Sequence, residues 1–304
     1  MRRAIVAATA CIGAGMFLYS LHVLGLAQVQ DTLARIGWSF TGILALSGAR
    51  EVVRTVAWMR TVEGPDRLPF RDAFPARLAG EALSTLLPMG MLIGEPAKAE
   101  HVGDRLPFAT ALGALMIELA FYGASLVLLF SAGLLALFPS SAVLFLMAIS
   151  LLAMPYVREK LGELRKFVAP VLGFASRHPA RARRIVILEA AYHVLGIAEV
   201  YLTLTLISPH PVAWTSAVVL ETVNRAITMT FKVLPMRMGV DEASAAMFAS
   251  RLDLGATTGL LLALVRKVRL LFWSAIGLGV LLMRTSKVPT MSSTRTSRWS
   301  AVRL

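Results

Sequence analysis

Long apolar runs, separated by short polar or basic segments, constrain this chain more than any other feature of its sequence. Residues 4–27, 107–138 and 185–207 are three such runs, and each reaches the roughly 20 residues that a bilayer-spanning helix requires. Hydrophobic residues make up 57% of the 304 residues and charged residues only 16%, whereas soluble domains carry about 25% charged residues. The sequence therefore predicts an all-α, polytopic membrane protein of the cytoplasmic (inner) membrane.

The net charge of +13 is located in three places. Arg2 and Arg3 supply two positive charges, the segment 157–184 supplies a net six, and the tail after residue 283 supplies five. Lys and Arg beside apolar spans mark the cytoplasmic side of a membrane protein. Both termini and the segment 157–184 are therefore expected in the cytoplasm. The same explanation disfavours nucleic-acid binding, which the basic composition could otherwise indicate.

One motif occurs twice, 147 residues apart. Residues 87–95 read LPMGMLIGE and residues 234–242 read LPMRMGVDE. Eight of the 24 positions aligned from residue 87 are identical, including a proline and a glutamate seven residues after it. Because Pro and Glu are not common letters in this chain, an internal duplication is favoured over coincidence.

The apolar stretch before the first copy is too short to span a bilayer, so each copy is expected to form a re-entrant or broken-helix element. Together with about six full spans, this assignment places every basic region on one side and gives the two copies opposite orientations. That arrangement is the inverted repeat of many secondary transporters. The predicted halves are residues 38–156 and 185–283.

The predicted membrane domain covers residues 1–283, and residues 284–304 are expected to be a disordered basic cytoplasmic tail. The segment 157–184, which joins the halves, has apolar residues at helical spacing. It is either an amphipathic helix on the anionic lipids of the inner leaflet or a solvated helical linker.

Charged residues within apolar runs are candidates for an internal site, because an ionised side chain at mid-membrane costs about 2.5–3.5 kcal/mol. Arg50, Glu51 and Arg54 either snorkel to the interface or line the protein interior. Each inward-facing residue belongs either to a structural ion pair or to a binding site. These residues are Glu81, Glu95, Glu118, Glu189, Glu199, Glu221, Arg225 and Glu242.

Both copies of the motif resemble elements of one known family. Pro88, Gly94, Glu95 and Lys98 are similar to a Pro, then Gly-Glu-x-x-Arg, element of the transmembrane, flippase-like region of lysylphosphatidylglycerol synthases. The second copy resembles a Pro, then Gly-Gly-x-Gly-x-x-Glu-Ala, element of that family, through Pro235, Gly239, Glu242 and Ala243. It departs from the family by having Met236 and Arg237 in place of two glycines.

The resemblance implies a membrane protein that handles lipids, in a stand-alone form without the aminoacyl-transfer domain. Transbilayer movement of a phospholipid or another amphiphile is the leading expectation. The predicted substrate-binding residues are Glu95, Lys98, Glu242, Arg237, Arg225, Glu81 and Glu221, and the predicted structural motif residues are Pro88, Gly94, Pro235 and Gly239.

Three other functions remain open on the sequence alone. The protein could position a separate lipid-modifying enzyme, or it could transport a small solute. It could also be an intramembrane enzyme that uses Glu189 and His193, four residues apart, as acid and base. A Glu and His pair at this spacing is more often structural, so no catalytic residue is predicted. The lone Cys11 excludes a Cys-based metal site, and without nucleotide or zinc signatures no cofactor or metal is expected.

Overall fold

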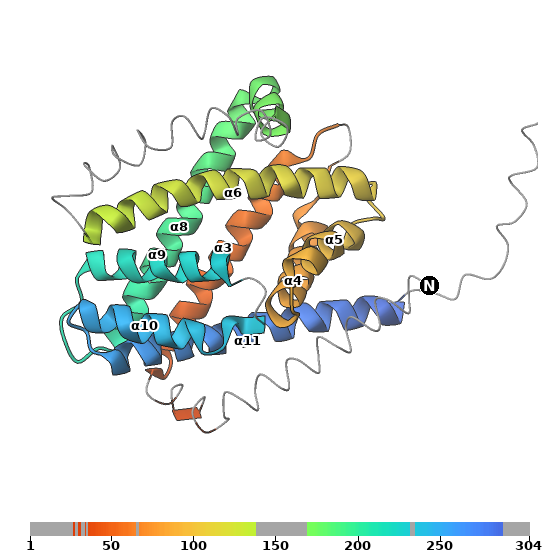
Figure 1. Cartoon of the computed structure of the whole chain (residues 1–304). Helices are drawn as coiled ribbons and strands as arrows, with labels where there is room; N and C mark the ends of the chain where they lie inside the picture. The colour runs from red at the N-terminus through yellow and green to blue at the C-terminus, as the bar shows by residue number, and fades with distance from the viewer. Residues whose placement is uncertain are drawn as a thin grey trace, which may run out of the picture.

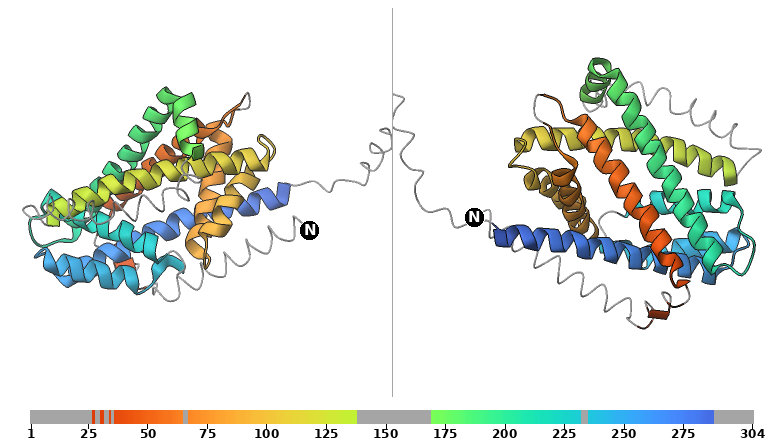
Figure 2. Two further views of the ribbon diagram at one scale, coloured as in Figure 1. Left: turned by 45° about the horizontal axis from the view of Figure 1, so that its top comes forward. Right: turned by 180° about the vertical axis from the view of Figure 1, so that it is seen from behind.

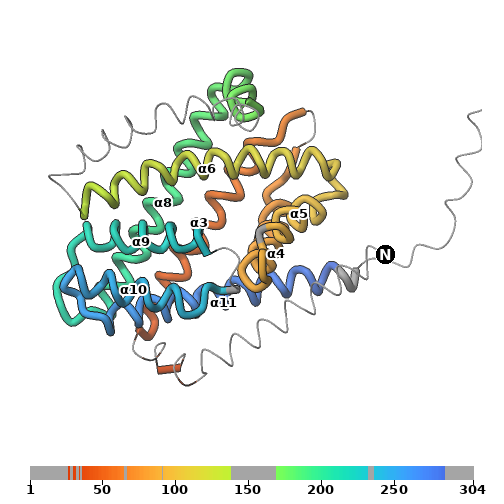
Figure 3. Tube along the Cα trace, viewed as in Figure 1, coloured from red at the N-terminus to blue at the C-terminus, as the bar shows by residue number. Residues whose placement is uncertain are grey.

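The computed structural model describes residues 36–64, 67–137, 169–231 and 235–287, and the single positions 27, 30, 31 and 34. These residues are coloured along the chain trace in Figure 3. All their regular secondary structure is helical, which confirms the all-α prediction. Most of the predicted span at 4–27, residues 138–168 and the tail beyond residue 287 lie outside the described residues.

The helices form two series of four with the same order of long and short members. The lengths are 23, 17, 11 and 30 residues in the first series and 29, 17, 12 and 32 in the second. The first series is α3 (Ser39–Thr61), α4 (Phe70–Leu86), α5 (Met91–His101) and α6 (Phe108–Leu137). The second is α8 (Pro179–Ile207), α9 (Trp214–Thr230), α10 (Val240–Arg251) and α11 (Ala256–Lys287), with a short 3-10 turn, η1 (Pro235–Arg237), before α10.

The motif spacing of 147 residues extends over both series. Shifting the first series by 147 residues brings the end of each helix within three residues of the end of its counterpart. The spacing first seen in two short motifs therefore relates helices over most of the described chain.

The two series pack against each other in a reciprocal way. The long helices α6 and α11 run along opposite sides of the molecule, with α4 and α5 near one end and α9 and α10 near the other (Figure 1). The helix α4 packs on α11 of the other series, and α9 packs on α6. Seen from behind, the first helices of the two series, α3 and α8, lie side by side across the molecule (Figure 2). Each series therefore completes the packing of the other.

Each copy of the motif forms the corner of a helical hairpin. Pro88 follows the end of α4, and Leu87 before it is extended, with ψ 146°, as steric contact with a following proline favours. Met89 has φ 52° and its counterpart Met236 has φ 49°. Since a left-handed conformation costs a residue with a Cβ atom roughly 1–2 kcal/mol, its occurrence at both methionines indicates that both corners require it.

Two of the described helices, α6 and α8, are long and apolar enough to cross a membrane. Both expose large apolar side chains and bury acidic ones. Leu128 on α6 and Ile187 on α8 are 64% and 60% exposed, whereas Glu118 and Glu189 on the same helices are 2% and 0% exposed. This arrangement is the reverse of a soluble helix and suits an apolar solvent.

The other long helices, α3 and α11, are not among the helices that meet this criterion. Arg50, Glu51 and Arg54 interrupt α3, and Arg266, Lys267 and Arg269 interrupt α11. The predicted count of about six spans therefore stays a prediction.

The helix α8 begins at Pro179, six residues before the boundary expected from sequence, and residues 169–177 are also helical. Proline is favoured in the first turn of a helix, so the basic residues after it extend α8.

Candidate functional site

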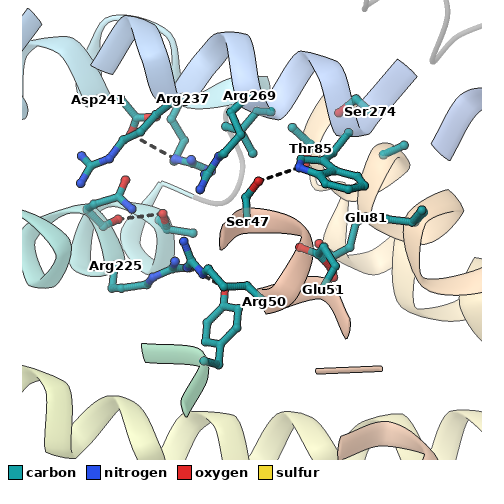
Figure 4. A pocket seen from close by; sticks show the side chains of 18 residues that line it. Ser47, Arg50, Glu51, Glu81, Thr85, Arg225, Arg237, Asp241, Arg269 and Ser274 are labelled. Carbon is teal, nitrogen blue, oxygen red and sulfur yellow. Dashed lines mark hydrogen bonds and ion pairs between the residues drawn. The ribbon is translucent and has the colours of Figure 1, made fainter. Parts of the chain in front are cut away.

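A cavity of about 160 Å³ lies between helices of both series. Its lining comes from α3, α4, α8, α9, α10, α11 and the turn η1. Eight of the lining side chains are charged (Figure 4). Arginines from the second series gather on one side of the cavity, with Asp241 beside Arg237, and two glutamates from the first series lie on the other.

The basic side of the cavity will be called the arginine wall. It consists of Arg225, Arg237, Arg266 and Arg269 of the second series, together with Arg50 of α3. The carboxylates that pair with these arginines are Glu199, Glu221 and Asp241. Five guanidinium groups thus face three carboxylates, so two positive charges of the wall have no counter-charge among these partners.

The carboxylate of Glu221 holds much of the arginine wall in place. It lies 2.7 Å from the guanidinium of Arg225, 3.3 Å from Arg50 and 3.7 Å from Arg266. Glu221 is 1% exposed. Glu199 on α8 binds Arg50 at 2.9 Å and also accepts a hydrogen bond from Arg269. These pairs join α3, α8, α9 and α11 around one side of the cavity.

The acidic side of the cavity, here called the acidic wall, consists of Glu51 on α3 and Glu81 on α4. Arg77 Nε donates to Glu51 Oε2 at 3.1 Å, and Lys98 Nζ donates to Glu81 Oε1 at 2.7 Å. Lys98 also donates to Glu95 at 2.7 Å. Arg77 and Lys98 are each 1% exposed and do not line the cavity, so they bind the carboxylates of the acidic wall from the protein interior.

The structure decides between the two interpretations of the charges on α3. Arg50 and Arg54 both point into the protein, and neither snorkels to an interface. Arg54 donates from Nε and Nη2 to the two oxygens of Glu118 at 2.8 and 2.9 Å. Its guanidinium lies 4.2 Å from the ring centre of Tyr122, a cation–π contact that stabilises the buried positive charge.

The second hairpin carries a different ion cluster. Glu242 accepts a hydrogen bond from the backbone N–H of Gly239 at 2.7 Å, which caps the start of α10. Lys267 Nζ lies 3.2 Å from Glu242 and 3.7 Å from Asp241, and it donates to the carbonyl of Met236 at 2.8 Å. The two repeated glutamates therefore each meet a buried lysine, but the lysines come from different helices.

The structure brings only part of the predicted site to the cavity. Glu81, Arg225 and Arg237 line it. The other four predicted substrate-binding residues lie outside the lining. Lys98 and Glu221 are 1% exposed in the ion clusters behind the walls, Glu95 is bound to Lys98, and Glu242 caps α10.

The predicted motif residues shape the two hairpins. A Cβ atom on Gly94 would lie 1.9 Å from Ser84 Oγ and 2.5 Å from the carbonyl oxygen of Gly80, so only glycine allows α5 to approach α4 this closely. Gly239 has φ 83°, a conformation that favours glycine. Pro88 follows α4, as described above, and Pro235 begins η1.

Met236 and Arg237 both adopt φ 49°. These are the two positions at which the resembled family has glycines. Met236 and Arg237 therefore depart from the family pattern in residue type but adopt the left-handed backbone conformation that glycine favours. Met236 is 1% exposed in the core between α4 and α11, and Arg237 reaches the cavity.

Glu189 and His193 have different partners. His193 Nε2 lies 2.8 Å from Ser125 Oγ, and Glu189 lies 4.0 Å from Arg54. Neither residue lines the cavity. The enzymatic alternative gains no support from this geometry.

A second depression lies at the other end of α4, and exposed ion pairs close it. Asp72 pairs with Arg105 at 2.9 Å and Asp104 with Arg284 at 3.0 Å. Burial, and then the charge of Arg284, lower the pKa of His101 in this depression to about 4. His101 is therefore neutral at pH 7, and Arg71 is the one charged group of the lining beyond the two ion pairs.

Residues 5–279 match the family described as the lysylphosphatidylglycerol synthase TM region. The chain belongs to this family. No curated protein and no solved structure matches the chain. Membership of the lysylphosphatidylglycerol synthase TM family, together with the apolar surfaces of α6 and α8, makes this chain a membrane protein with a lipid-related role.

Sequence reasoning missed several residues of the cavity in this family member. It placed none of five lining residues in the site, namely Arg50, Glu51, Tyr192, Asp241 and Arg269. One signal was available, since Arg266 and Arg269 lie on adjacent turns of an otherwise apolar run, as Arg50 and Arg54 do. Charges repeated three or four residues apart in an apolar helix mark a face that is turned away from lipid.

Proposed function

We propose that this protein is a lipid flippase that moves a phosphate-bearing amphiphile across the cytoplasmic membrane without converting it chemically. One observation carries the proposal, namely a charged cavity lined by helices of both series in a protein whose helices α6 and α8 expose apolar side chains. A headgroup that crosses a bilayer must leave water, and the desolvation of a charged group costs many kcal/mol unless opposite charges replace the water. The cavity walls supply such charges.

The arginine wall is the part of the cavity that suits a phosphate. Arginine offers planar, bidentate donors that match phosphate oxygens. Arg237, Arg266 and Arg269 each hold a carboxylate on one side while lining the cavity. The sequence shows no nucleotide-binding signature, so we propose movement down a gradient or coupled to an ion.

We also propose that the two series form an inverted repeat. The matching order of helix lengths, the reciprocal packing of α4 on α11 and of α9 on α6, and the left-handed Met89 and Met236 support it. In such folds the substrate site lies at the interface between the repeats. The cavity lies at this interface.

The inverted arrangement predicts which positions are accessible from each side of the membrane. In a Cys11→Ser background, single cysteines at Gln30 and His210 should react with an impermeant thiol reagent added outside cells. Cysteines at Glu100 and Pro170 should react only after the membrane is opened. Labelling of position 100 from outside, with position 30 also labelled, would contradict the opposite orientation of the two copies.

The flippase proposal predicts a large effect from one arginine of the cavity. Arg269→Gln removes a charged donor from the arginine wall, while Glu199 keeps its bond to Arg50. A hydrogen bond to a charged group contributes about 1.5–3 kcal/mol, so transbilayer movement should slow about tenfold or more. The measurement is the leaflet exchange of a fluorescent phospholipid in vesicles that contain the purified protein.

A matched control is available on α10. Arg251 is exposed and lies over the ring of Phe248 at 5.9 Å, away from the cavity. Arg251→Gln removes the same charge and should leave the rate unchanged within about twofold, since isolated surface charges contribute little. The flippase proposal is wrong if leaflet exchange of phospholipid is no faster in vesicles with the unmodified protein than in protein-free vesicles.

A further inference from the structure

The cavity presents two oppositely charged walls to the same space. Figure 4 shows Arg225, Arg237 and Arg269 on one side and the carboxylates of Glu51 and Glu81 on the other. An ion of one sign would satisfy only one of these walls. The charge separation therefore describes a ligand that carries both signs.

The arginine wall retains donors that no protein group uses. Arg237 binds Asp241 through Nε, and Arg269 binds Glu199 through Nη1. The other nitrogens of these two guanidiniums have no hydrogen bond within the part of the chain that the structure describes. Arg50 is 4% exposed, and its Nε is buried without a hydrogen-bond partner among the described residues. A buried donor without a partner costs about 1–3 kcal/mol, so an anion that accepts these hydrogen bonds would be stabilised.

The acidic wall retains acceptors in the same way. Glu51 uses Oε2 for Arg77, and Glu81 uses Oε1 for both Lys98 and Arg77. The second oxygen of each carboxylate accepts no hydrogen bond from any described residue. The side chains are 24% and 34% exposed, so these oxygens are the parts of the pair that remain open to a ligand.

The supporting groups behind the acidic wall leave it negative. Arg54, Arg77 and Lys98 are the cations of this cluster, and the carboxylates that accept hydrogen bonds from them are Glu51, Glu81, Glu95 and Glu118. Four carboxylates therefore face three cations, so one negative charge lacks a counter-charge on this side, whereas two positive charges lack one on the arginine wall. A primary ammonium group, with three donors and one positive charge, is complementary to the acidic wall.

We propose that the cavity binds a zwitterionic phospholipid headgroup, with its phosphate against the arginine wall and its primary ammonium against Glu51 and Glu81. This inference rests on the proposed flippase function and names its substrate class. The cavity volume of about 160 Å³ holds about ten water molecules, which leaves room for a small headgroup. A headgroup with phosphate and hydroxyls alone would leave the acidic wall without a cation.

Lipid preference of the unmodified protein tests this inference without relying on a variant. Vesicles that contain the full chain are loaded with acyl-labelled phosphatidylethanolamine, phosphatidylglycerol or N-acetylated phosphatidylethanolamine, and leaflet exchange is measured for each lipid. All three carry the same phosphate, but only the first carries an ammonium. We expect phosphatidylethanolamine to move about tenfold faster than the other two, a ratio that one charge-assisted hydrogen bond supports.

The variant Glu51→Gln assigns the preference to the acidic wall. It keeps the shape of the side chain, and Arg77 retains Glu81 and Glu118 as counter-ions. The exchange rate of phosphatidylethanolamine should fall to within about twofold of that of phosphatidylglycerol. The reason is that only one of the two carboxylates that pair with the ammonium remains. Arg251→Gln is the control and should keep the full preference.

Equal rates for phosphatidylethanolamine and phosphatidylglycerol would overturn the zwitterion inference and leave the flippase proposal standing. A preference that Glu51→Gln does not change would also overturn it. Movement of none of the lipids would instead remove the flippase proposal itself. A free-solute source is tested with water-soluble glycerophosphoethanolamine. We expect it to slow the movement of labelled phosphatidylethanolamine by competition, whereas its uptake into the vesicles with no lipid exchange would contradict a lipid ligand.

Discussion

Replacing Glu221 with glutamine is expected to lower the free energy of unfolding by about 3–5 kcal/mol, the usual cost of removing one partner from a buried ion pair. The substitution keeps the size of the side chain and removes its charge. Arg225 and Arg266 would then lose their nearest carboxylate, and Arg50 would keep only Glu199. Because Glu221 is 1% exposed, water cannot easily replace the lost charge. The measurement is thermal or denaturant unfolding of the purified protein in detergent.

An exposed ion pair provides the comparison for Glu221. Asp72→Asn removes a carboxylate that pairs with Arg105 at 2.9 Å, and the two side chains are 29% and 50% exposed. Surface pairs contribute about 0–1 kcal/mol, so this variant should unfold almost as the unmodified protein does. If Glu221→Gln also costs less than about 1 kcal/mol, the buried arginines must be compensated by water or by a bound anion. The cohesion of the four helices around the arginine wall would then need another explanation.

Replacing Gly94 with alanine is expected to destabilise the first hairpin by about 1–3 kcal/mol or more, as overpacking does in a close-packed interior. The added methyl would lie 1.9 Å from Ser84 Oγ and 2.5 Å from the carbonyl oxygen of Gly80. The serine side chain can rotate away, but the backbone carbonyl cannot. The helices α4 and α5 would therefore have to separate, and Lys98 on α5 would move away from Glu81 on α4. Unfolding in detergent measures the loss, and lipid exchange should slow as well.

A glycine in open space separates this effect from helix propensity. Gly123 lies inside α6, and a Cβ atom there would meet no described heavy atom within 4 Å. Gly123→Ala should stabilise the protein by up to about 1 kcal/mol, since alanine is the better helix former. The two variants make the same chemical change with opposite expected signs. Stabilisation by Gly94→Ala would show that the two hairpin helices are not in close contact.

Much of the fold could be predicted from sequence because apolar periodicity and helix-stopping residues are local signals. The apolar run 107–138 corresponds to α6 with boundaries that differ by one residue, and the run 185–207 lies within α8 and ends at the same residue. Pro88 and Pro235 marked the corners of the hairpins. The spacing of 147 residues between the two motif copies also proved to relate whole helices.

The site was harder to predict than the fold, because a charge in an apolar run has several explanations. Arg50 could have snorkelled, and only the packing of α3 and α9 on α8 shows that it meets Glu199 and Glu221. Lys98 and Glu95 were expected in the cavity on the strength of the family resemblance. They bind each other behind its wall, since Lys98 must compensate two carboxylates at once.

By itself the sequence determined the helical class, the membrane setting, the family, and the two breaks in the helical chain at Pro88 and Pro235. These follow from composition, apolar run length and local stereochemistry, which act between residues close in the chain. Only the tertiary structure decided which charges face one another. Arg269 and Glu199, and Glu81 and Lys98, meet across helices, and whether two charges pair depends on how the helices pack. The division of the cavity into an arginine wall and an acidic wall therefore exists only once both helix series are assembled.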